Sequence, residues 1–251
     1  MHFKFLTMKR KIGITITLLF VILSTSVAQN LLDGKNYERP KTDSLPKVEK
    51  VEIFRDRMLI DVFHSFWLGM PAAVNSNKFN PGVNVSILWD IKKKSQSPFS
   101  FGIGAGVNYH TQKSNAIIGI DSRNWITQYN ILPQMDTTYK ICRLDIVSLY
   151  IPLEFRYRHD SGFKFSIGAR LGSIVSVAQR YRGKDLSGKN QMVDYKDYQI
   201  FNKMKYHFDF YARIGWEGLG IFYSYQLTPL FESGKGPQVS PMSIGISISP
   251  F

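Results

Sequence analysis

Apolar and polar residues alternate with a period of two from about residue 58 to the end of the chain, and no other feature constrains the fold as strongly. This period belongs to β-strands, because successive side chains of a strand point to opposite faces. Eight segments carry the pattern. Seven of them have one face that is almost wholly apolar, and they lie at residues 83–91, 99–109, 147–157, 163–171, 206–216, 219–227 and 242–248. The eighth, residues 58–69, is partly apolar on both faces, so its register stays open.

The connections between these segments alternate strictly between short and long. Those at about 92–98, 159–162 and 217–218 are short, whereas those at about 70–80, 111–143, 177–205 and 229–240 are longer. In outer-membrane barrels the short turns and both chain ends face the periplasm, and the long loops face outside. The sequence therefore predicts an all-β fold, an eight-stranded antiparallel up-and-down transmembrane β-barrel.

The residues opposite the apolar faces distinguish a membrane barrel from a soluble one. Three of these faces consist largely of glycine and serine, and they read Ser100, Gly102, Gly104, Gly106 and Asn108; Ser166, Gly168, Arg170 and Gly172; and Ser243, Gly245, Ser247 and Ser249. Such residues suit a narrow, crowded lumen, whereas soluble eight-stranded barrels turn their apolar face inward around a ligand. We therefore expect the apolar face to meet lipid. A soluble periplasmic ligand-binding barrel is the alternative.

Aromatic residues of the strands fall into two groups, one next to the short turns and one near the long loops. Trp89, Phe99, Phe155 and Trp216 belong to the first group, and Tyr206 belongs to the second. Membrane barrels carry two such bands at the lipid–water interfaces. Because aromatic residues favour strands in any case, ordinary strand composition is the competing explanation.

The N-terminal 28 residues have the features of a cleaved secretory signal peptide. Four basic residues precede an apolar run at 12–23, and small residues follow up to Ala28. The run is shorter than the roughly 20 residues that a membrane helix needs, so an uncleaved signal anchor is the weaker alternative. Residues 29–56 are polar and are predicted to be a periplasmic leader, and 57–251 form the barrel. Export together with a barrel predicts an outer-membrane location.

The basic excess of the chain is partly explained by this signal. Four of the 32 basic residues and none of the 19 acidic residues lie within 1–28, so the remainder keeps 28 basic residues and a net charge of +9. No nucleic-acid-binding motif accompanies the excess, so nucleic acid is not expected as a partner. We expect outer-membrane lipid and lipopolysaccharide as partners instead. Their phosphates would meet a basic outer loop within 177–205 that contains Arg180, Arg182, Lys184 and Lys189, although a simply solvated loop is the more ordinary explanation.

Several charged residues fall on the inward faces of neighbouring strands, and we predict that they form a lumen charge network. They are Glu154, Arg156, Arg158, Arg170, Asp209 and Arg213. Charges enclosed by a barrel must be paired, and an eight-stranded interior is just wide enough for side chains. The network therefore predicts a plugged barrel. A proton or anion path lined by these arginines is the alternative.

Catalytic and metal chemistry find little support in the sequence. His64, His110 and His207 lie on or beside strands, but no serine, histidine and acid share a geometry that can be inferred. We expect no catalytic, cofactor-binding or metal-binding residues and no cofactor. A lipid-modifying outer-membrane barrel enzyme is the alternative in another class. One cysteine, Cys142, rules out a disulfide framework and is expected to be a small, partly buried residue.

Two adjacent segments resemble the outer-membrane β-barrel domain of the PorT-like family of Bacteroidota. The strand Ser148 to Tyr157 contains a Leu-x-Ile-Pro-Leu motif at 149–153, and a glycine-containing strand, 163–172, follows it after a tight turn. The segment 223–231 is also similar. The resemblance spans roughly 58–251 and implies a secretion-associated barrel, with type IX secretion-machinery proteins as partners and an accessory or structural role. It carries no catalytic motif.

Two prolines of this region bear on the local structure. Pro152 is expected to mark a strand irregularity, because proline cannot donate to a sheet ladder. Phe251 supplies the aromatic C-terminus usual in outer-membrane barrels, but it is out of phase with the apolar face of 242–248. A bulge at Pro250 would restore the phase.

Overall fold

The computed structural model describes residues 58–76, 79–91, 97–132, 139–186 and 191–249. The predicted signal peptide, the predicted leader at 29–56, Pro250 and Phe251 lie outside the described residues. The described residues belong to one compact unit, Glu52–Phe251, and all of their regular secondary structure is β-sheet. Among them there is no helix long and apolar enough to cross a membrane.

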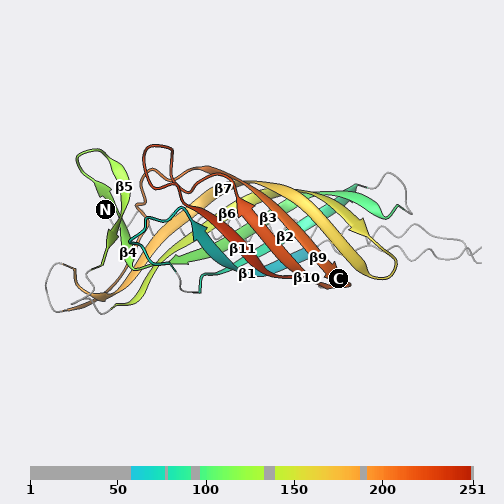
Figure 1. The fold of residues 1–251 in the computed structure, drawn as a ribbon, viewed down its shortest axis with the longest axis horizontal. Helices are drawn as coiled ribbons and strands as arrows, with labels where there is room; N and C mark the ends of the chain where they lie inside the picture. The colour runs from blue at the N-terminus through green and yellow to red at the C-terminus, as the bar shows by residue number, and fades with distance from the viewer. Residues whose placement is uncertain (1–57, 77–78, 92–96, 133–138, 187–190, 250–251) are drawn as a thin grey trace, which may run out of the picture. The chain divides into compact units, whose positions relative to one another are not determined.

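Eight antiparallel strands close into a barrel (Figure 1). Each strand pairs with its neighbours in the chain, the last strand pairs with the first, and the closure confirms the predicted fold. The eight strands are β1 (Met58–Leu68), β2 (Pro81–Ile91), β3 (Phe99–Lys113), β6 (Tyr139–Arg158), β7 (Phe163–Lys184), β9 (Tyr206–Trp216), β10 (Leu219–Gln226) and β11 (Ser240–Ile248). The beginning of β1 and the end of β11 lie at the barrel end that holds the short turns, because Ile60 pairs with Ile248 and Ile248 with Leu219.

The outer surface of the barrel wall is apolar and the lumen is polar. On β3 the outward Phe101, Ile103 and Val107 are exposed, whereas the inward Ser100 and Asn108 are buried. The same division holds on the other barrel strands, whose outward side chains include Ile87, Trp89, Leu149, Ile151, Ile167, Phe210, Ile214, Ile221, Ile244 and Ile246. This is the inside-out arrangement of a barrel whose wall faces lipid, and it is the reverse of a soluble ligand-binding barrel.

The register of β1, which the sequence left open, places Asp61, Phe63 and Trp67 inside. Phe63 is opposite Gly82 on one neighbouring strand and Gly245 on the other. A Cβ atom at Gly82 would overlap the Phe63 ring, whereas one at Gly245 would overlap the backbone of Val62 and Phe63. Gly82 thus makes the space for a large ring in the lumen, and Gly245 allows the close approach of β11 to β1. Both faces of β1 look apolar because the lumen contains these rings.

The long connections contain more regular structure than the sequence analysis expected. β4 (Ala116–Asp121) and β5 (Ile126–Ile131) form a hairpin, and β8 (Met192–Asp197) pairs with an extension of β7. β6 and β7 are 20 and 22 residues long. That is about twice the roughly 9–11 residues that span a bilayer, so both strands continue well beyond the wall. In Figure 1 the β4–β5 hairpin stands at the end opposite the C-terminus.

A hydrophobic core lies at this long-loop end. It includes Trp67 of β1, Leu144 and Ile146 of β6, and Phe231, which is fully buried; its other members are Ile174, Val177, Ile200, Leu230 and Val239. Asn202 connects the segments around it, since its Nδ2 atom donates to the backbone oxygens of Trp125 (2.7 Å) and Lys235 (3.2 Å). We call these ordered loop segments, 114–131, 198–205 and 228–239, the outer cap.

The pairing of β3 with β6 is interrupted opposite Pro152, the residue expected to mark an irregularity. The ladder runs through Ile103 and Leu153, breaks off, and resumes at Gly106 and Tyr150. Proline has no N–H to donate, which accounts for the break on this side of β6. A shift of register between β6 and β7 follows at Val147 and Ser148.

Candidate functional site

The six residues of the predicted lumen network all lie on strands that line the barrel interior. Glu154, Arg156, Arg170, Asp209 and Arg213 are buried, and Arg158 is half-buried near the short-turn end. The structure divides them into two groups. Glu154, Arg156, Arg158 and Arg213 share one chain of ion pairs, which also includes two acids from β1 and β2. Arg170 and Asp209 form a second group.

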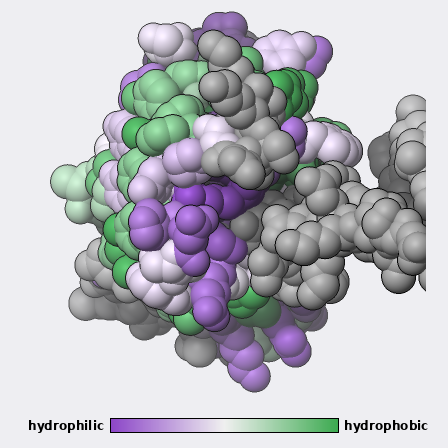
Figure 2. Space-filling model, turned by 90° about the vertical axis from the view of Figure 1, so that its right-hand side faces the viewer, coloured by the Kyte–Doolittle hydropathy of each residue, from purple (hydrophilic) through white to green (hydrophobic). Residues whose placement is uncertain are grey.

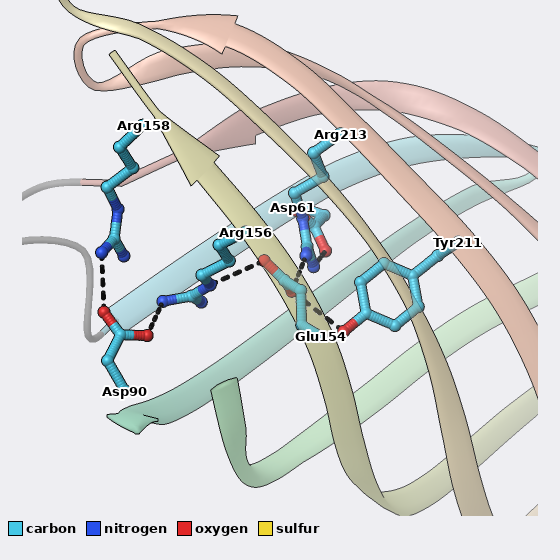
Figure 3. Close-up of polar contacts among 7 residues, drawn as sticks. All are labelled: Asp61, Asp90, Glu154, Arg156, Arg158, Tyr211 and Arg213. Atoms are coloured by element: carbon cyan, nitrogen blue, oxygen red, sulfur yellow. Dashed lines mark hydrogen bonds and ion pairs between the residues drawn. The ribbon is translucent and has the colours of Figure 1, made fainter. Parts of the chain in front are cut away.

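Arg213 of β9 is the centre of the first group (Figure 3). Its Nη2 atom is 2.8 Å from Asp61 Oδ2 and its Nε atom is 3.0 Å from Asp61 Oδ1, while its Nη1 atom is 2.7 Å from Glu154 Oε2. The hydroxyl of Tyr211 donates to the same Glu154 oxygen at 2.9 Å. These charge-assisted contacts join β1, β6 and β9 across the lumen, and the contact with Asp61 is bidentate.

The chain of ion pairs continues toward the short-turn end. Glu154 Oε1 is 2.8 Å from Arg156 Nε, and Asp90 of β2 bridges Arg156 at 2.9 Å and Arg158 at 2.7 Å. Three carboxylates and three guanidinium groups therefore alternate in one connected set (Figure 3). The charges balance within the set, so it needs no additional ion to neutralise it.

The second group lies further along the lumen. The Arg170 guanidinium is surrounded by three rings, with its Cζ atom 5.1 Å from the ring centre of Tyr150, 4.8 Å from that of Tyr211 and 5.3 Å from that of Phe222. Its Nε atom is 3.7 Å from Asp209 Oδ2, a longer separation than those of the first group. Cation–π contacts of this kind help to stabilise a desolvated cation.

Asp61, Asp90 and Tyr211 were not predicted from the sequence to belong to the network. Asp61 was hidden because the register of β1 was open, and Asp90 because it falls at the end of its strand. Tyr211 shares the inward face with Asp209 and Arg213, so strict alternation through β9 contained the signal that would have found it.

The predicted basic outer loop is partly described. Arg180, Arg182 and Lys184 lie on the extension of β7, whereas Lys189 lies outside the described residues. Asp194 of β8 is 3.6 Å from Arg180 Nη2 and 3.8 Å from Arg182 Nε. Part of the basic charge is therefore paired within the sheet, across an exposed surface where such pairs contribute little to stability.

A histidine–acid pair lies in the lumen. His207 Nδ1 is 2.9 Å from Asp209 Oδ1, and the buried His207 Nε2 atom has no hydrogen-bond partner within the part of the chain that the structure describes. Across the same residues, no group of three or more histidine, cysteine or acidic side chains could hold a metal ion. Cys142 is buried, and its Sγ atom donates to the Ala116 carbonyl at 3.2 Å.

At the short-turn end of the barrel, hydrophilic residues gather near the middle and extend to the lower edge of the view, with hydrophobic residues beside them (Figure 2). A cavity of about 60 Å³ opens here between Arg156, Arg213 and Ser247. It has room for only a few water molecules. The charge network thus occupies most of the lumen at this end.

Comparisons with known proteins identify no family for this chain. No protein-family profile matches the chain, and no curated protein sequence matches it. Among solved structures, the chain is similar to Ail, the attachment invasion locus protein of Yersinia pestis, in complex with the heparin analogue sucrose octasulfate. The two are 11% identical, the match covers 76% of this chain and 95% of Ail, and the TM-score is 0.38. The barrel assignment accordingly rests on the strand pairing described above.

Proposed function

We propose that the chain is an integral outer-membrane β-barrel protein with an accessory or structural role, and that its outer cap performs this role. The observation that carries the proposal is the apolar outer wall around a polar, charge-paired lumen. Such a wall would be insoluble in water and is stable in a bilayer, where closure of the barrel satisfies the backbone hydrogen bonds of every wall strand. The outer membrane is the membrane in which such barrels reside, and the predicted signal peptide provides for export.

The closed lumen supports a role that needs no passage through the barrel. Ion pairs fill the short-turn end, and the hydrophobic core of the outer cap fills the other end. We therefore propose neither a porin nor an enzyme. The His207–Asp209 pair is the one feature that favours the alternative of a lipid-modifying enzyme, yet Asp209 also contacts Arg170, which suits a structural role.

The resemblance to PorT-like barrels extends the proposal to type IX protein secretion. The interrupted ladder at Pro152 and the glycine-containing β7 strand correspond to the residues that carry this resemblance. Secretion-machinery proteins would then contact the outer cap or the periplasmic leader. Export of type IX substrates by cells that lack the chain tests this extension, and unchanged export would remove it without affecting the barrel proposal.

Membrane insertion is tested by electrophoresis of the outer-membrane fraction with and without boiling. We expect the unboiled protein to require detergent for extraction and to migrate faster than the boiled protein. Ile246→Arg places a charge on the outer wall, about 2–4 kcal/mol unfavourable near the bilayer midplane, and should abolish the heat-dependent shift. Leu186→Arg is the matched control, because Leu186 is similarly exposed but lies beyond the wall (47% against 52% for Ile246). A soluble protein that tolerates Ile246→Arg would overturn the proposal.

A further inference from the structure

Strand β8 is the free edge of the nine-stranded sheet. It pairs with β7 on one side, and the strand order of the sheet ends with it. Five of its six residues are exposed, and only Val193 is half-buried. An edge of this kind presents a row of backbone N–H and C=O groups to any added strand. Natural edges are commonly blocked by proline, a bulge, short length or charged side chains; β8 contains neither proline nor a bulge, but it is six residues long and carries Lys196.

The charges along β8 are only half satisfied by β7. Asp194 lies opposite Arg182 and near Arg180, as described above, whereas Lys196 lies opposite Arg180, a like charge. Within the described residues the contact of Lys196 is with the ring of Tyr198, 5.1 Å from its Nζ atom, and with no carboxylate. A carboxylate on the open side of β8 would therefore complement Lys196, since like charges directly opposite are destabilising.

A second copy of β8 supplies that carboxylate. We propose that two copies of this chain pair through their β8 strands, antiparallel and centred on Tyr195. In this register Asp194 of each copy lies opposite Lys196 of the other, which forms two equivalent ion pairs, and the two Tyr195 rings lie side by side. Such a contact is isologous, as a two-fold symmetric interface requires. Shifting the register by one residue would place Asp194 opposite Tyr195 and lose both ion pairs.

The direction of the strands determines how the two barrels are oriented. β7 runs outward from the barrel and β8 runs back, so an antiparallel partner of β8 runs outward beside it. The partner's own β7 then runs toward the first barrel, so the second barrel is inverted. Given the outer-membrane location proposed above, on which this inference rests, the contact joins barrels in facing membranes. It is small, but many copies on two surfaces bind together far more tightly than one pair does.

Cysteine cross-linking of the full chain in detergent tests the register directly. Residue 195 is its own partner in the proposed pairing, so Tyr195→Cys should form a disulfide-linked dimer on mild oxidation. Met192→Cys is the matched control on the same strand, because the two copies of residue 192 would be about 20 Å apart. The parent chain, with only the buried Cys142, controls for that thiol. Cross-linking of Tyr195→Cys no faster than Met192→Cys would overturn the proposal.

Charge reversal tests whether the contact joins facing membranes. Phosphatidylcholine vesicles containing the parent chain should cluster, as light scattering reports, and those with Asp194→Lys or with Lys196→Asp should not. Mixing the two variant vesicle populations should restore clustering, because every 194–196 pair then has opposite charges. Asp160→Lys makes the same charge change in a turn at the other barrel end and should cluster normally. Heat-dependent migration in the same vesicles reports insertion, so inserted barrels that never cluster refute this inference and leave the barrel proposal intact.

Discussion

At the residue scale, the lumen is stabilised by shared ion pairs that come from distant parts of the chain. Arg213 contacts Asp61 and Glu154, which are 152 and 59 positions away in the sequence. Glu154 was predicted to be in the network because it shares a clear strand face with Arg156. Asp61 was not, because its inward position depends on the register of β1, in which glycines of two other strands allow the inward Phe63 and the close approach of β11. Partners that meet only on closure of the barrel cannot be identified from one strand's periodicity.

Removal of the central cation should be costly. Arg213→Met leaves Asp61 and Glu154 buried side by side without their shared partner, and we expect a loss of about 3–5 kcal/mol in the free energy of unfolding. Urea titration in detergent micelles, followed by tryptophan fluorescence, measures the loss. Adding Asp61→Asn should recover part of it.

The exposed pair of Arg182 and Asp194 provides the control for this measurement. Arg182→Met should change the free energy of unfolding by no more than about 1 kcal/mol, because solvent screens the pair. Equal losses for Arg182→Met and Arg213→Met would mean that the lumen network contributes no more than a surface pair does.

At the element scale, eight strands could be predicted from the sequence, together with the inward and outward faces of all but β1, whereas the strands β4, β5 and β8 could not. The wall strands alternate cleanly because one side meets lipid and the other the lumen. β8 and the outer part of β7 lie beyond the wall, and five of the six β8 residues are exposed, so no buried face imposes alternation on β8, whose composition resembles that of a charged loop. Their pairing depends on tertiary contacts such as that of Tyr181 with Tyr195.

Two lumen glycines of β3 should respond very differently to the same substitution. A Cβ atom at Gly104 would lie 2.9 Å from the backbone of Leu88, which cannot give way without moving β2, so Gly104→Ala should lower the unfolding midpoint in urea. At Gly102 the nearest atom is the end of the Leu88 side chain at 3.3 Å, so Gly102→Ala should be nearly neutral. Similar midpoints for the two variants would contradict a close approach of β2 and β3 at Gly104.

At the scale of the whole molecule, the polarity of the interior reverses along the barrel. Near the short turns the interior consists of paired charges beneath an apolar wall, and at the long-loop end it is a hydrophobic core within exposed loops. The outer cap is therefore packed like a water-soluble domain. The sequence predicted a plugged barrel from the lumen charges alone, and the core of the outer cap is a second closure that its loop-like composition did not indicate.

The outer cap should open without loss of the barrel. Phe231→Ala removes a fully buried ring from the core of the outer cap. We expect it to lower the stability of the outer cap by about 3–5 kcal/mol and to affect the barrel wall much less. We expect trypsin to cleave at Lys203 or Lys205 in this variant and not in the parent chain, while heat-dependent migration persists. Phe201→Ala, which truncates an exposed ring in the same segment, should stay resistant. Cleavage of both variants alike would show that the ordered segment does not depend on its core.

The two closures act in series, and this makes a prediction about conduction. An ion that enters through an opened outer cap still meets the Arg213 network, where three carboxylates and three guanidinium groups border a cavity of about 60 Å³. Planar bilayers should therefore show no steady conductance with the parent chain, and none with Phe231→Ala. The triple variant Phe231→Ala, Tyr211→Ala and Arg213→Ala removes side chains from both the outer cap and the charge network. Those triple-variant barrels that still show heat-dependent migration should conduct a steady current. A steady current through the parent chain would mean that the lumen is an open path, and its arginines would then line an anion route.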